Sequence, residues 1–132
     1  MGDLLELWII SPEGLTIFNA RAKSVKESVN PNLLSGFINA VRGMLQVSTN
    51  SDIESINLSE QKLIFQAFDC RGKNLLFIAR VYNRFKDKSI KKQLLKIGQE
   101  FNTKYGAQIP DWKCDTSLFD GFEKDLGDFF VD

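Results

Sequence analysis

The segment from Leu75 to Phe85 constrains the fold more than any other part of the sequence, because its first half is apolar in both alternating registers. The residues that would point to one face of a strand are Leu75, Phe77, Ala79 and Val81. The opposite register begins with Leu76 and Ile78. A strand that is apolar on both faces is covered on both sides, so this strand is expected inside a sheet that lies between two layers.

Four more strands and three helices are expected around this segment. The strand segments are 4–10, 15–20, 53–59 and 62–69. The first two are joined by Ser11-Pro12-Glu13-Gly14, which has the residues of a type I turn, and Gly72 suits a tight turn before the central strand. The helices are expected over 30–46, from Asp87 or Ser89 to Tyr105, and from Asp115 nearly to the end.

The last of these helices is expected to be continuous and amphipathic. Its apolar face would consist of Leu118, Phe119, Phe122, Leu126, Phe129 and Phe130. Gly106 is expected to end the preceding helix as a C′ residue.

These elements predict a single α+β domain over residues 1–132, with a five-stranded antiparallel sheet. Edge strands tend to be short and polar, and the segment 53–59 is both. The central segment 75–85 is the reverse, so it is placed beside the first strand, which gives the order 2-1-5-4-3. One helix would cover one face and two helices the other, and three layers explain strands that are apolar on both sides.

The succession β-β-α-β-β-β-α-α and this strand order resemble the longin domain, a profilin-like fold. The matching segments cover nearly the whole chain, from the hairpin 4–20 through the helix 30–46 and the meander to Phe85. A roadblock domain, which is related, starts with an extra helix, whereas a strand begins here at Leu4, so the longin arrangement is favoured. SNARE-type longins, which act in membrane fusion, continue into a coiled-coil segment and a membrane anchor, and an end at Asp132 would leave both out.

The resemblance implies a protein-binding scaffold without chemistry of its own. It is similar to the stand-alone longins of vesicle tethering and coat complexes, and prokaryotic longins of this kind are associated with small GTPases. It therefore implies a homodimer, or a dimer with a related longin or roadblock partner, that binds or regulates a small GTPase or a membrane-traffic-type assembly.

The sequence contains no constellation that predicts catalysis, a cofactor or a metal ion. The absence of histidine excludes His-based triads and His zinc ligands, and neither a Walker loop nor a GxGxxG motif is present. Cys70 lies beside Arg71, so a reactive thiol is the rival enzyme hypothesis, but no base stands near it in the sequence. The carboxylates near the chain end are expected to be a solvated helix face: Asp120, Glu123, Asp125 and Asp128.

A line of small residues on the first helix suggests a protein interface. Gly36, Ala40 and Gly43 follow helical spacing, and each glycine costs about 1 kcal/mol against alanine inside a helix, which suggests a steric reason. Two interpretations stay open: a partner covers this line, or it packs against the chain's own sheet or lies exposed. With the open third strand the predicted interface comprises Gly36, Ala40, Gly43, Ile53, Ser55, Asn57 and Ser59.

Charge is unevenly placed although the chain as a whole has equal numbers of acidic and basic residues, 17 of each. Residues 73–104 hold nine basic and two acidic residues, and residues 105–132 hold two basic and seven acidic ones. The basic helix either pairs with the acidic last helix or binds anionic lipid or RNA through Lys88, Lys91, Lys92 and Lys96. RNA binding would favour exposed aromatics between the lysines, and nucleic acid is not expected as a partner.

The location is expected to be cytoplasmic. The N-terminus lacks a basic, apolar signal sequence, and no stretch of 18 apolar residues spans a bilayer. Two distant cysteines, Cys70 and Cys114, suit a reducing compartment.

Overall fold

The computed structural model describes residues 2–26, 31–48, 55–57, 60–109 and 116–131. Its strands are β1 (Glu6–Ile10), β2 (Thr16–Arg21), β3 (Ser55–Asn57), β4 (Gln61–Cys70) and β5 (Lys73–Tyr82). Its helices are α1 (Pro31–Ser48), α2 (Asp87–Tyr105) and α3 (Phe122–Asp125), and three 3₁₀ turns are η1 (Gly106–Gln108), η2 (Thr116–Phe119) and η3 (Gly127–Phe129).

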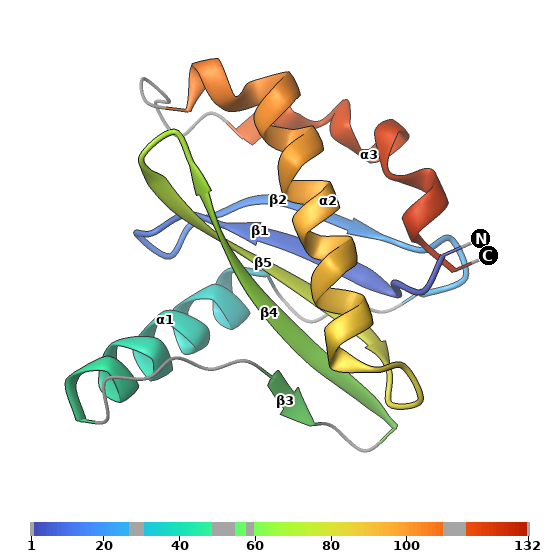
Figure 1. Cartoon of the computed structure of the whole chain (residues 1–132), viewed down its shortest axis with the longest axis horizontal. Helices are drawn as coiled ribbons and strands as arrows, with labels where there is room; N and C mark the ends of the chain where they lie inside the picture. Colours follow the sequence, from blue (N-terminus) through green and yellow to red (C-terminus); the bar gives the residue numbers. More distant parts are fainter. Residues whose placement is uncertain (1, 27–30, 49–54, 58–59, 110–115, 132) are drawn as a thin grey trace.

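The strands form one antiparallel sheet in the order β2-β1-β5-β4-β3, as the sequence predicted (Figure 1). The central strand β5 pairs with β1 on one side and along its full length with β4 on the other. The β4–β5 turn places Arg71 at φ 52° and Gly72 at φ 94°, both in the left-handed region. Positive φ at both central residues characterises the type I′ hairpin turn, whose twist matches that of the two strands.

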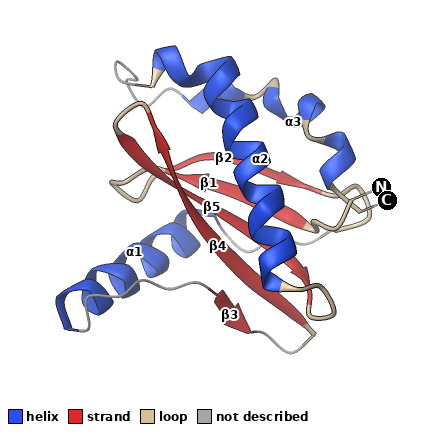
Figure 2. Ribbon diagram, viewed as in Figure 1, coloured by secondary structure: helices blue, strands red, loops and turns tan. Residues whose placement is uncertain are grey.

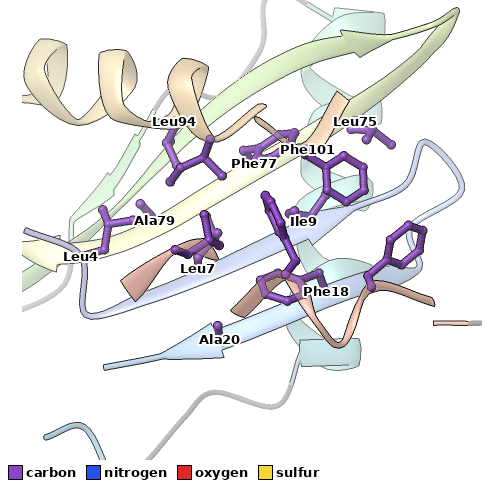
Figure 3. Packing of buried hydrophobic residues seen from close by; sticks show 14 of the residues in the cluster. Leu4, Leu7, Ile9, Phe18, Ala20, Leu75, Phe77, Ala79, Leu94 and Phe101 are labelled. Carbon is purple, nitrogen blue, oxygen red and sulfur yellow. The ribbon is translucent and has the colours of Figure 1, made fainter. Parts of the chain in front are cut away.

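The core has two layers, one on each face of the sheet, which confirms the expected three-layer arrangement. Leu7 and Ile9 of β1 belong to the larger cluster, with Leu94 and Phe101 of α2 (Figure 3). The alternate residues of β1 belong to a second cluster that lies under α1, and its fully described buried members are Trp8, Ile10, Leu34, Ile38, Leu63, Phe65, Leu76 and Ile78. Figure 2 shows α2 crossing the sheet on the side where α3 also lies.

The last helix is not continuous, and this prediction was wrong. The described segment after residue 115 consists of η2, α3 and η3, which are separated by breaks near Gly121 and Gly127. Phe119, Phe122 and Leu126 are buried as expected, but Leu118 is 38% exposed. Short turns can direct successive apolar side chains into the core where one straight helix axis would carry some of them away.

The segment after η3 is extended and pairs with the N-terminus, which the sequence did not predict. The amide of Leu4 donates to the carbonyl of Phe129 at 3.0 Å, and the amide of Val131 donates to the carbonyl of Leu4 at 2.9 Å. This parallel bridge holds both chain ends together beside β1.

Gly106 also differs from the expectation, since its φ is −56° and it begins η1. A Cβ at this position would lie 2.1 Å from Oδ1 of Asn102, so a larger residue here would displace the side chain of Asn102.

Candidate protein-interaction surfaces

The helix α1 is held against the sheet by a few side chains of its first turns. Leu34 and Ile38 are buried in the second core cluster, and the hydroxyl of the buried Ser35 hydrogen-bonds that of Thr16 in β2. The side chain of Asn39 lies against Gly14 of the hairpin turn, where an added Cβ would come within 2.6 Å of Nδ2 of Asn39. These contacts determine which side of α1 faces the sheet.

The small residues of α1 therefore lie on its outer side. Gly36, Ala40 and Gly43 are all exposed. A Cβ built at Gly36 or at Gly43 would meet no atom within 4 Å. The small line therefore does not pack against the chain's own sheet. It is a surface that either is covered by a partner or lies exposed.

The strand β3 is the second component of the predicted interface, and it is the open edge of the sheet. Ser55, Ile56 and Asn57 pair with Ile64, Leu63 and Lys62 of β4. Asn57 is exposed and Ser55 half-buried, while Ile53 and Ser59 lie outside the described residues. Ile56 packs against the same core cluster as Leu34 and Ile38, so β3 and α1 share one apolar layer.

A buried polar cluster on the α1 side of the sheet was not predicted from the sequence. Glu6 is 0% exposed, and its carboxylate lies 3.1 Å from Nη2 of Arg80 on the neighbouring strand. Nδ2 of Asn19, from β2, donates to the same carboxylate at 3.1 Å and to the carbonyl of Leu7 at 3.0 Å. Glu6 and Arg80 each interrupt an apolar register in the sequence, which was the available signal, but only the pairing of β1 with β5 shows that they meet.

The geometry around Cys70 does not support the rival enzyme hypothesis. Its thiol is fully buried, and Sγ lies 3.5 Å from Oδ1 of Asn102. Burial raises the pKa of this thiol, although Arg71 opposes that effect. A buried, protonated thiol is a poor nucleophile. Within the described parts of the chain, no three acidic, cysteine or histidine side chains are grouped as metal ligands.

The lysines of α2 form the other candidate surface. Lys88, Lys92 and Lys96 are exposed, whereas Lys91 is half-buried. Among the described residues, Lys104 of α2 forms an ion pair with Asp125 of the acidic C-terminal segment at 2.6 Å. The remaining carboxylates proposed as a solvated face are exposed, namely Asp120, Glu123 and Asp128.

Comparison with known proteins assigns the fold. No protein-family model matches the chain, and no curated protein matches its sequence. Among solved structures, the gliding protein MglB from Thermus thermophilus superposes with a TM-score of 0.59 at 12% identity, covering 80% of this chain and 79% of that one. Myxococcus xanthus MglB superposes with a TM-score of 0.55 at 11% identity, covering 79% of this chain and 85% of that one.

The chain has the longin/roadblock fold. A third structure, described as MglB with a tetrameric arrangement, matches this fold with a TM-score of 0.52 at 11% identity over 80% of the chain. In the described part of this longin/roadblock chain, no helix has the length and apolarity needed to cross a bilayer.

Proposed function

We propose that this longin/roadblock chain is a non-enzymatic interaction module that dimerises through α1 and β3 and binds or regulates a small GTPase or a membrane-traffic-type assembly. The observation that carries the proposal is the outward-facing line of Gly36, Ala40 and Gly43 beside the open edge β3. A cytoplasmic location is part of the proposal, since Cys70 is a free thiol.

The dimer follows from the geometry of an edge strand. Backbone groups on the outer side of β3 can pair with an antiparallel copy of the same strand. Two identical antiparallel strands in one sheet are related by a two-fold axis perpendicular to the sheet, so both copies of α1 would lie on one face. The small line allows two helix backbones to approach closely there, and each protomer would supply the same patch.

The pairing is not blocked by the usual protective residues. The described edge, Ser55–Asn57, contains neither lysine nor proline, the residues that most often prevent strand addition. A related longin or roadblock chain in place of the second copy would use the same surface.

The GTPase part of the proposal rests on resemblance. Stand-alone longins of prokaryotes are associated with small GTPases, and the fold of this chain matches that of MglB, a gliding protein that one structure describes in a tetrameric arrangement. These likenesses favour a regulatory assembly over an isolated monomer.

Replacement of Ala40 by arginine tests the dimer. Arginine is a good helix former and Ala40 is exposed, so Ala40→Arg is expected to fold and to elute as a monomer of 15.0 kDa in size exclusion with light scattering. Ala107→Arg is the matched control, because Ala107 is exposed in η1, and it should remain a dimer. A monomeric wild type at high micromolar concentration would contradict the proposed dimer.

Nucleotide-dependent capture tests the GTPase. The immobilised chain is incubated with an extract of its source cells in the presence of GDP or a non-hydrolysable GTP analogue. A small GTPase retained in only one nucleotide state, and retained equally by Ala107→Arg, is the expected result. If no small GTPase is retained in either state, the GTPase part is wrong while the dimer can still stand.

A further inference from the structure

Three lysines form a straight basic stripe on the outer side of α2. Lys88, Lys92 and Lys96 recur every four residues and are exposed. A rise of 1.5 Å per residue places the first and last Cα atoms about 12 Å apart on one side of the helix. The opposite side of α2 is buried in the core, so the stripe points away from the sheet, along a helix that forms the outer surface (Figure 1).

The charge of this basic stripe is not neutralised within the described part of the chain, where none of its three lysines has an ion-pair partner. Two carboxylates on or beside α2 are paired with other lysines: Asp87 lies 2.6 Å from Lys62, and Asp125 lies 2.6 Å from Lys104. Glu100, one turn beyond Lys96, is the acidic residue at which the stripe ends.

The basic surface continues into the β5–α2 turn. Arg84 and Lys86 are exposed there, directly before α2. The guanidinium of Arg84 lies 4.9 Å from the ring centroid of Tyr82 and 4.8 Å from that of Phe85, so its charge is held in place at the end of the stripe. Leu95, beside Lys92 and Lys96 in the helix, is 39% exposed and adds an apolar contact.

We propose that the basic stripe, with Arg84 and Lys86, is a docking surface for an anionic lipid bilayer. Protein–protein interfaces are depleted of lysine, which makes an acidic protein the weaker candidate. Single-stranded RNA is bound mainly by aromatic stacking between basic residues, and the aromatic residues of α2, Phe101 and Tyr105, are buried. The nearby rings of Tyr82 and Phe85 are already covered by the guanidinium of Arg84. A row of flexible point charges on a convex helix suits a flat surface of diffuse negative charge.

Vesicle co-sedimentation tests the surface with the full chain. Vesicles containing 30% phosphatidylserine are the probe, and pure phosphatidylcholine vesicles are the control. Each lysine near an anionic bilayer contributes about fivefold in affinity, so K88Q/K92Q/K96Q should bind about 100-fold more weakly than wild type. Because the charges are exposed, raising the salt from 0.1 M to 0.5 M should also release the wild type.

A second triple variant separates the place of the charges from their number. K23Q/K26Q/K124Q removes three exposed lysines that lie outside α2 and produces the same net charge. It should bind as the wild type does, and circular dichroism should show both variants folded. Equal loss of binding in both variants, no binding of wild type to the anionic vesicles, or binding to polyuridine alone would each overturn the proposal. The test is independent of dimerisation and of any GTPase.

Discussion

Truncation of Phe77 tests the claim that β5 is the centre of the molecule. Phe77 is fully buried in the middle of β5, near Phe101 (Figure 3), and its ring contacts two others edge-on. The ring centroids of Phe68 and Phe101 lie 6.0 Å and 6.2 Å from that of Phe77. Phe77→Ala therefore removes a side chain that joins β4, β5 and α2 in the larger core cluster.

The expected cost follows from burial and from these ring contacts. Replacement of a buried phenylalanine by alanine lowers the free energy of unfolding by about 3–5 kcal/mol, because apolar surface is lost and a cavity remains. Edge-to-face aromatic pairs contribute about 0.5–1.5 kcal/mol each beyond area burial, so two such pairs place Phe77→Ala near 5 kcal/mol. A domain of this size has a total stability of about 5–15 kcal/mol, so the variant loses between about a third and all of it.

Urea unfolding followed by circular dichroism measures this cost. With a slope of about 1.5 kcal/mol per molar urea, the midpoint of Phe77→Ala should fall by about 3 M. Leu95→Ala is the control, since Leu95 is 39% exposed on α2, and it should change stability by no more than about 0.5 kcal/mol. Phe77→Leu retains most of the volume and should lose about 1.5 kcal/mol, which keeps the test informative if the alanine variant does not fold. A midpoint for Phe77→Ala equal to that of Leu95→Ala would refute the central position of β5.

Two further predictions concern the α2 side of the sheet, and Gly36 on α1 provides the control for the first. A Cβ at Gly98 would lie 2.6 Å from the ring of Phe68, so Gly98→Ala should lose about 1–2 kcal/mol in urea unfolding, although alanine is the better helix former. Gly36→Ala, where a Cβ meets nothing within 4 Å, should be neutral or gain up to about 1 kcal/mol under monomeric conditions, and equal losses in both variants would contradict the packing. In a Cys114→Ser background, Cys70 should resist thiol labelling at pH 8 until the chain is unfolded. Rapid labelling of the native protein would contradict the buried thiol. Burial raises the pKa of Cys70 in the folded state, so the thiol of the unfolded chain ionises first as the pH passes 9.0. The free energy of unfolding should therefore fall above that pH, and the Cys70→Ala variant should lack this fall.

The position of each strand in the sheet was predictable from local sequence, because burial of a strand is visible in its composition. The segment around Phe77 is apolar in both registers, so it had to lie inside a three-layer structure. The short, polar segment around Ile56 suited an edge, and the structure places it there. The glycines Gly14 and Gly72 indicated the positions of two hairpin turns in the sequence. In the structure both adopt a φ of 94°, which other residues disfavour.

The C-terminal segment was predicted less well, because its conformation depends on distant partners. The spacing of Phe119, Phe122 and Leu126 indicates a helix, and each of these residues is buried. The chain nevertheless breaks into short turns and then pairs with Leu4, nearly the whole length of the sequence away. Helical periodicity reports which residues are buried, but a backbone hydrogen bond to another strand leaves no trace in it.

The sequence by itself determined the fold class, the strand order and the residue types of both candidate surfaces. Only the tertiary structure decided how these residues are directed. The line through Ala40 faces outward because Leu34 and Ile38, on the opposite side of α1, are buried against the sheet. Glu6 is tolerated at 0% exposure because strand register brings Arg80 to within 3.1 Å of it. Composition and periodicity describe one segment at a time, whereas the direction of a side chain and the partner of a charge depend on which segments meet.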